Sequence, residues 1–436
     1  MIVRSVLTAG ALAAALASPA HAQGPASDRG CAPGLRVPGA ETQVTACLDD
    51  LTTAGTIASG HTVPADWAGL HAGGTRNPSG VPGVQVDGYF PDTSTFNTNN
   101  GWNHDAQFVI RLPEKWNGGL VVAGSPGNRR QYANDFTISD WVLAQGYAYA
   151  ATDKGNSGVE FYKDGRRPGD AVVEWNHRLT ELTRAAKKTV ARHYGRGPGK
   201  TFAAGISNGG YLVRWQLENR PHLYDGGIDA EGTLWREKGP NLFTYLPSIL
   251  RAYPAYEAGD QSAHKALLNA GLAPGSEFLW PFHDQVYWGL TQRIYREEFD
   301  PAYTGDEAAY NYAARPRNVH RAVARVALTG KIRKPLMTLH GTYDTLLPIG
   351  TDSDVYAELV RAKGKAPYRY YRLEAANHVD GLYDTYPDRL RPLLPCMRTA
   401  FTALENWTRE GRTPPPSTTL PRPATGDLVN ACSLTS

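Results

Sequence analysis

The sequence predicts an α/β protein with a mostly parallel sheet that is covered by helices on both faces. Short apolar segments alternate with amphipathic helical segments from residue 83 to residue 232, as is typical of a parallel sheet. The alternation then stops for about a hundred residues, far more than a crossover between strands needs. It resumes at Lys334. We therefore expect a large helical cap inserted into an α/β core.

The first 22 residues have the features of a secretory signal peptide. Arg4 supplies a positive charge, an apolar run follows, and Ala-His-Ala at 20–22 is a small-x-small cleavage site. The alternative is a membrane anchor, but a spanning helix needs about 20 apolar residues and no later segment offers them. We expect cleavage after Ala22 and export to the periplasm or the medium.

Export would permit disulfides, and the chain has four cysteines. They allow three pairings, of which Cys31–Cys47 with Cys396–Cys432 closes the shortest loops at the lowest entropic cost. No cysteine lies near a histidine and there is no C-x-x-C, which disfavours a catalytic or zinc-binding role. With 45 basic and 42 acidic residues and no basic stripe, we expect no nucleic-acid partner.

Along the chain, residues 23–82 are rich in Gly, Pro, Ala and Thr, and we expect an irregular N-terminal segment there. The first part of the core, 83–232, follows. Its strands are predicted at 83–90, 106–113, 118–124, 147–153, 201–207 and 224–232, and its helices at 137–145, 174–194 and 211–220.

The cap is predicted over 233–333, and the core continues over 334–410. In this second part we expect strands at 334–341 and 368–374 and helices at 353–363 and 388–409. The tail, 411–436, is rich in proline, which cannot continue a helix. We expect it to form an extended strap fastened by Cys432.

Ser207 is the candidate nucleophile. It lies in a G-x-S-x-G pattern with Gly205 and Gly209, after an apolar strand and before an amphipathic helix. In this setting a sharp turn exposes the serine hydroxyl above the sheet. The bland alternative is a serine between glycines, because the pattern alone arises by chance roughly once in four or five chains of this composition.

A serine nucleophile needs a base, and the base needs an acidic partner. Asp344 follows the strand at 334–341, and His378 follows the strand at 368–374, so both lie at strand ends in the order Ser, Asp, His. Asp229 is a second candidate for the acid. The oxyanion hole should use the backbone N–H of Asn208 and one donor from the loop after 118–124, either Ser125 or Gly127; Pro126 has no N–H.

These motifs, "GISNGG", "HGTYDTLLP" and "AANHVDG", resemble those of the α/β-hydrolase superfamily over about residues 83–410. The exported chain with "SNGG" and a large cap looks like 3-hydroxybutyrate oligomer hydrolases and the tannase/feruloyl esterase group. Two departures stand out. Tannase-type enzymes have adjoining cysteines where this chain has Ile206 and Asn377, and the usual His-Gly-Gly oxyanion loop is replaced by "AGSPGN".

Substrate selection is expected in the cap, which is dense in aromatic residues. Among them Trp280 and Trp288 are candidates to contact an apolar or aromatic group, although most aromatic side chains there should form the cap's own core. Arg129 and Arg130 adjoin the presumed oxyanion loop and could pair with a substrate carboxylate, unless they are simply solvated.

No metal or cofactor is expected. Glu174 and His177 have i, i+3 spacing, but a di-metal site would need a second such pair. The sequence therefore predicts an exported serine hydrolase that cleaves carboxylic esters through an acyl-enzyme. A serine peptidase on the same fold is the alternative, and a non-catalytic binding protein is the second. The oligomeric state is not indicated.

Overall fold

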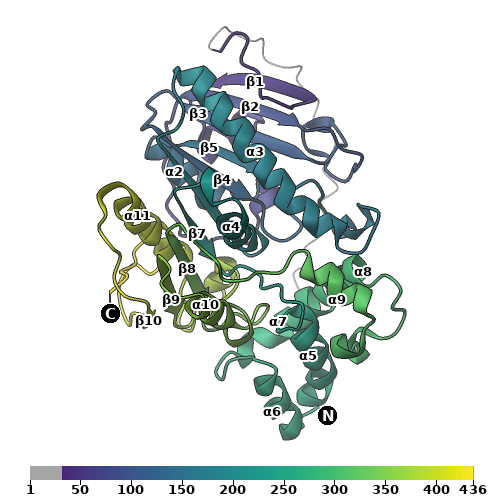
Figure 1. The fold of residues 1–436 in the computed structure, drawn as a ribbon. Helices are drawn as coiled ribbons and strands as arrows, with labels where there is room; N and C mark the ends of the chain where they lie inside the picture. Colours follow the sequence, from purple (N-terminus) through teal and green to yellow (C-terminus); the bar gives the residue numbers. More distant parts are fainter. Residues whose placement is uncertain (1–31, 436) are drawn as a thin grey trace, which may run out of the picture.

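The computed structural model describes residues 32–435, and their strands form one ten-stranded sheet in the order β1-β2-β3-β5-β4-β6-β7-β8-β9-β10 (Figure 1). The pairs β1–β2, β2–β3 and β3–β5 are antiparallel, and every other neighbouring pair is parallel. The mostly parallel sheet is thus confirmed. The strands are β1 (Thr42–Leu48), β2 (Gly83–Tyr89), β3 (Gln107–Pro113), β4 (Gly119–Gly124), β5 (Ala148–Thr152), β6 (Lys200–Ile206), β7 (Gly226–Ala230), β8 (Leu336–Gly341), β9 (Tyr368–Leu373) and β10 (Thr418–Leu420).

Alternate residues of the central strands enter two separate apolar layers, as the pleat requires. In β4, Leu120 and Val122 belong to one layer, whereas Val121 and Ala123 belong to the other. The first layer is closed by α3 (Asp170–Tyr194), α4 (Asn208–Asn219) and α10 (Ser353–Ala362). The second is closed by α2 (Asp140–Ala144) and α11 (Leu394–Glu410). Helices on both faces confirm the predicted layers.

Between β7 and β8 the chain forms α5 (Leu242–Glu257), α6 (Gln261–Asn269), α7 (Trp280–His283), α8 (Gly289–Phe299) and α9 (Arg317–Ala324). These helices gather at one end of the sheet (Figure 1). They have an aromatic interior, in which Trp235 packs against Phe243 and Phe299 with ring centroids 5.7 and 4.8 Å away. This interior is continuous with the apolar layer beneath α3 and α4, so the segment rests on the core.

Two expectations were wrong in detail. The segment 23–82 is not irregular throughout, because Thr42–Leu48 forms β1, which pairs with β2 in the register Thr42↔Tyr89, and α1 (Thr53–Ser59) follows it. β1 is only partly buried, so its sequence shows no strong apolar alternation; pairing with β2 makes it a strand. The last helix begins at Leu394 instead of residue 388, because Leu393 and Leu394 donate their N–H groups to the buried Asp380 carboxylate.

The predicted bridge between Cys396 and Cys432 is present, with Cα atoms 4.9 Å apart. Cys47 is also disulfide-bonded. Cys31 and the signal peptide expected at residues 1–22 lie outside the described residues. Across residues 32–435, no helix is long and apolar enough to cross a membrane.

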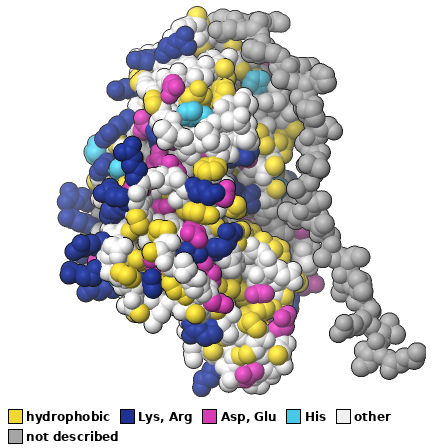
Figure 2. All heavy atoms as spheres, turned by 90° about the vertical axis from the view of Figure 1, so that its right-hand side faces the viewer, with side chains coloured by type: hydrophobic (Ala, Val, Ile, Leu, Met, Phe, Trp, Pro, Cys, Tyr) yellow, Lys and Arg dark blue, Asp and Glu magenta, His cyan; other side chains and the backbone are white. Residues whose placement is uncertain are grey.

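The surface carries charges of both signs. Figure 2 shows acidic and basic side chains on one face, with Lys and Arg gathered along its left edge. On α3, Arg184, Lys188 and Arg192 are exposed while Leu182 and Val190 are buried, so the helix turns its basic side to solvent.

Candidate active site

Ser207 lies on the tight turn between β6 and α4. Its backbone has φ 57° and ψ −122°, a conformation that costs energy for any residue with a side chain. Such strain is held by surrounding structure and is characteristic of a serine presented on a nucleophile elbow. The strand, turn and helix predicted around Ser207 are therefore all present.

The glycines of the G-x-S-x-G pattern are required by close backbone approach. A Cβ on Gly205 would lie 2.3 Å from the carbonyl carbon of Gly209, and a Cβ on Gly209 would lie 2.6 Å from the carbonyl oxygen of Gly124. Both contacts are with backbone, which cannot move aside as a side chain can. The pattern thus lets α4 start directly against β6 and β4.

The structure brings Ser207, His378 and Asp344 together from the ends of β6, β9 and β8. The Ser207 Oγ atom is 3.0 Å from His378 Nε2, and His378 Nδ1 is 2.7 Å from Asp344 Oδ2. All three side chains are almost fully buried. The catalytic triads of serine hydrolases have the same hydrogen-bonded order of serine, histidine and aspartate.

Asp344 is held as a carboxylate. Its Oδ1 atom accepts the N–H groups of Leu346 at 2.9 Å and Leu347 at 2.7 Å. Burial by itself would raise the pKa of Asp344, but the charge and hydrogen bonds of His378 and His340 outweigh it and hold the pKa below its usual range. An ionised Asp344 can fix the proton of His378 on Nδ1 and leave Nε2 free to accept one.

Asp229, the second candidate for the acid, makes its hydrogen bonds to residues other than His378. Its Oδ2 atom accepts from Arg214 Nε at 2.6 Å and from the Thr338 hydroxyl at 2.8 Å. Arg214 also donates to Asp352 at 3.0 Å, which makes a fully buried ion-pair network beneath the site. Of the two carboxylates proposed from the sequence, only Asp344 contacts His378.

Two groups beside the triad were missed from the sequence. The buried Glu231 comes directly after β7, and its Oε2 atom is 3.7 Å from His378 Nδ1. Burial, reinforced by the Asp344 charge, raises the pKa of Glu231 well above its usual value, a shift that favours the neutral acid. His340, in β8, brings its Nε2 atom to 3.1 Å from Asp344 Oδ2. The rule that pointed to Asp344, a polar residue at a strand's carboxyl end, would also have found Glu231.

The backbone hydrogen bonds distinguish among the three residues predicted to donate N–H groups to an oxyanion. Asn208 opens α4, where the first N–H groups have no intrahelical partner. Ser125 is a wrong candidate, because its N–H donates to the Thr152 carbonyl at 3.1 Å. Gly127 lines the pocket, and its N–H has no partner within the described residues.

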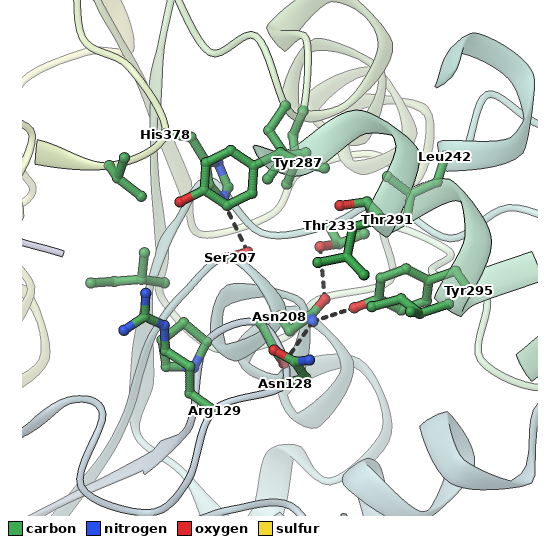
Figure 3. A pocket seen from close by; sticks show the side chains of 18 of the residues that line it. Asn128, Arg129, Ser207, Asn208, Thr233, Leu242, Tyr287, Thr291, Tyr295 and His378 are labelled. Carbon is green, nitrogen blue, oxygen red and sulfur yellow. Dashed lines mark hydrogen bonds between the residues drawn. The ribbon is translucent and has the colours of Figure 1, made fainter. Parts of the chain in front are cut away.

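The Asn208 side chain connects this loop to the segment between β7 and β8, residues 233–333, which we call the cap segment (Figure 3). Its amide donates to the Gly127 carbonyl at 2.9 Å and to the hydroxyl of Tyr295 in α8, and its oxygen accepts from Thr233 at 3.0 Å. The core, the loop that contains Gly127 and the cap segment thus meet at Asn208.

A cavity of about 180 Å³ opens over Ser207 and His378. Its wall is mainly apolar, and α8 with the turn before it supplies one side (Figure 3). The residues that line it are Leu70, Pro126, Gly127, Asn128, Arg129, Ile206, Ser207, Asn208, Thr233, Leu242, Tyr287, Leu290, Thr291, Ile294, Tyr295, Leu346, Leu347, His378 and Val379.

Of the four substrate-binding residues predicted from the sequence, only Arg129 lines this cavity. Trp280 and Trp288 are fully buried, with their indole N–H groups bonded to the Ser276 hydroxyl and the Thr345 carbonyl, so they belong to the interior of the cap segment. Arg130 donates to the Asn99 side chain at 3.2 Å instead.

Two groups in residues 32–435 have ligand atoms close enough to surround a metal ion. They are Glu231, His340 and Asp344 in one place and Asp92, Asp164 and Glu174 in the other. In the first, Asp344 already accepts from His378; in the second, Arg178 supplies positive charge to Glu174 at 2.7 Å. In each group, at least one carboxylate therefore already has a basic side chain as its partner.

Comparison with solved structures shows that the protein has the α/β-hydrolase fold. The crystal structure of feruloyl esterase B from Aspergillus oryzae matches with a TM-score of 0.56 at 15% identity, over 79% of this chain and 86% of that one. A second Aspergillus oryzae esterase matches with a TM-score of 0.54 at 14% identity, over 87% and 88%.

Sequence comparison places the similarity among esterases, as the motifs suggested. Residues 93–233 match the family model "Tannase and feruloyl esterase", and residues 257–436 match "3HB-oligomer hydrolase". The first match contains Ser207, and the second contains Asp344 and His378. The mono(2-hydroxyethyl) terephthalate hydrolase of Piscinibacter sakaiensis is 29% identical over 140 residues, which are 29% of this chain and 23% of that protein.

Proposed function

We propose that this protein is an exported serine hydrolase that cleaves carboxylic esters through an acyl-enzyme. The observation that carries the proposal is the hydrogen-bonded chain from Ser207 Oγ through His378 to Asp344, at three strand ends of an α/β-hydrolase sheet. Similarity to esterase families supports the choice of reaction.

In the proposed mechanism His378 Nε2 takes the proton of Ser207 as Oγ attacks the ester carbonyl carbon. The negative oxygen of the tetrahedral intermediate accepts the N–H groups of Asn208 and Gly127. As the intermediate collapses, the ester C–O bond breaks and His378 returns the proton to the leaving alcohol. Water, activated by the same His378, then releases the acid and restores Ser207.

The segment 233–333 acts as a cap in this proposal. Its helix α8 supplies Leu290, Thr291 and Ile294 to one wall of the cavity, and Tyr295 bonds to Asn208 beside the nucleophile. An apolar wall suits the hydrocarbon parts of an ester. Export through the signal peptide at 1–22, with cleavage after Ala22, is part of the proposal and would bring the enzyme to substrates outside the cytoplasm.

The test compares 4-nitrophenyl butyrate with a 4-nitroanilide of the same acyl group, using wild type and Ser207→Ala. We expect ester cleavage by the wild type and a loss of at least about 10⁴-fold in kcat in the variant, with an unchanged circular dichroism spectrum. A fluorophosphonate should label the wild type at one serine. Faster cleavage of the anilide would favour a peptidase, and no labelling with no turnover would favour a binding protein.

A further inference from the structure

Arg129 is anchored so that one edge of its guanidinium stays available. Its Nη1 atom donates to the backbone carbonyls of Asp66 at 2.9 Å and Ala68 at 3.0 Å. Within the described residues, Nε and Nη2 have no hydrogen-bond partner. These two N–H groups form the fork that matches the two oxygens of a carboxylate.

The charge of this group also lacks an ion-pair partner among the described residues. No carboxylate of residues 32–435 forms an ion pair with Arg129, although the side chain is partly buried, and desolvation lowers its pKa. The negative charge of Asp66 offsets part of this effect, but its carboxyl group makes no ion pair with Arg129 and accepts from Asn99 instead. A partly desolvated cation without a partner is costly unless a ligand supplies one.

Arg129 occupies the cavity that contains Ser207. Tyr287, from the cap segment, lies near enough for its hydroxyl and the guanidinium to influence each other electrostatically. In Figure 3 both polar ends lie on one side of Ser207, whereas Thr291, Leu242 and Tyr295 lie on the other. The Tyr287 hydroxyl has no hydrogen bond within the described residues, so it too can donate to a ligand.

We propose that Arg129 is a specificity-determining residue that binds a carboxylate of the substrate, so the preferred esters are acidic ones in which a short chain joins a free carboxylate to the ester group. The inference rests on the proposed ester hydrolysis. Nε and Nη2 of Arg129 hold the carboxylate with help from the Tyr287 hydroxyl, and the apolar cavity accommodates the chain that joins it to the ester.

Arg130 is the matched control. It has the same side chain one position along the loop, but it donates to Asn99 and does not line the cavity. Replacing Arg130 by Gln therefore changes the net charge by the same amount as Arg129→Gln, without removing a cation from the site. A difference in substrate preference between the two variants therefore reflects the position of the arginine in the cavity and not the net charge of the protein.

The experiment uses pairs of esters with the same shape. Monoethyl adipate and ethyl 6-methylheptanoate place the carboxylate or its neutral isostere on the acyl side; 6-acetoxyhexanoate and 6-methylheptyl acetate place it on the alcohol side. Shorter homologues of each pair are assayed by pH-stat titration. We expect the wild type to prefer the charged member of at least one pair by at least about tenfold in kcat/KM.

Arg129→Gln should reduce that preference by at least about tenfold, mainly through KM, while Arg130→Gln leaves the preference as in the wild type. The wild-type preference should also weaken as NaCl is raised. Equal losses on both members of a pair in Arg129→Gln would overturn the inference, since they indicate a structural role. A wild type that cleaves the neutral esters but prefers no charged one overturns it as well, and leaves the proposed function standing. Failure to cleave any ester overturns both.

Discussion

Two buried carboxyl groups lie beside His378, and their surroundings favour different protonation states. Asp344 accepts two backbone N–H groups and the Nδ1 proton of His378, so it stays ionised. Glu231 accepts a single N–H, from Gly341 at 3.0 Å, and its burial favours the neutral acid. In the proposed mechanism, these hydrogen bonds favour Asp344 as the acidic partner of His378.

Exchanging each carboxyl group for its amide separates the two roles. Asp344→Asn should lower kcat by roughly 10⁴-fold, because an amide cannot stabilise the imidazolium or fix the reactive tautomer of His378. Glu231→Gln should stay within about tenfold of the wild type, since Gln can still accept from Gly341. Rates on 4-nitrophenyl butyrate measure both. A larger loss in Glu231→Gln than in Asp344→Asn would reverse the assignment.

The stability of the wild type should fall with rising pH because of Glu231. Its pKa in the folded protein is raised above the ordinary 4.5, so the native state keeps a proton that the unfolded chain has already released. This contribution to stability is complete below pH 4.5 and is lost as pH rises through the folded pKa. The Gln side chain does not titrate in this range. In thermal unfolding, the midpoint of Glu231→Gln should therefore rise relative to that of the wild type between pH 5 and pH 8. If the midpoints of the variant and the wild type differ by the same amount at pH 5 and at pH 8, Glu231 does not contribute to the pH dependence of stability.

At the residue scale the sequence could predict what strand ends dictate, but not which way a side chain turns. Ser207, Asp344 and His378 follow apolar strands, and the structure brings them into hydrogen-bond contact. Trp280 and Trp288 were chosen for their type, yet packing within the cap segment buries them. Whether an aromatic ring faces a cavity or an interior depends on the crossing of several helices, which one sequence does not reveal.

At the element scale, the start of α4 depends on glycine. Gly209→Ala would place a Cβ 2.6 Å from the Gly124 carbonyl oxygen, which belongs to β4 and cannot yield easily. We expect a loss of about 1–3 kcal/mol in stability from overpacking, and lower activity because α4 carries the Asn208 N–H. Gly197→Ala is the control, since a Cβ there meets nothing within 4 Å. Urea unfolding of both variants measures the difference; equal midpoints would argue against a close contact.

Most elements of the core were predictable, because each has a clear apolar period and turn residues at its ends. The strands predicted at 83–90, 106–113 and 118–124 match β2, β3 and β4, and each boundary differs by at most one residue. β1 and the start of α11 were not predictable, because they depend on partners distant in sequence: β2 for the one and Asp380 for the other.

At the scale of the whole molecule, the strap at 411–436 joins separate parts of the core. Its β10 pairs with β9 in the register Thr418↔Tyr371 and is the last strand at this end of the sheet. Farther along, Asp427 forms an ion pair with Arg76, in the segment before β2. The strap thus connects the last strands of the sheet to the N-terminal part of the chain, and Cys432 fastens it to α11.

Removing that fastening should destabilise the protein without changing the active site, which the bridge does not touch. Cys396 and Cys432 are 36 residues apart, and closing a loop of this length restricts the unfolded chain by about 3–4 kcal/mol in the chain-entropy description. The double variant Cys396→Ser/Cys432→Ser is preferable to a reducing agent, because Cys47 is also disulfide-bonded. We expect a lower thermal midpoint, faster proteolysis within 411–436, and near-normal kcat on 4-nitrophenyl butyrate at 25 °C. An unchanged midpoint would mean that β10 and the Arg76 ion pair hold the strap without the bridge.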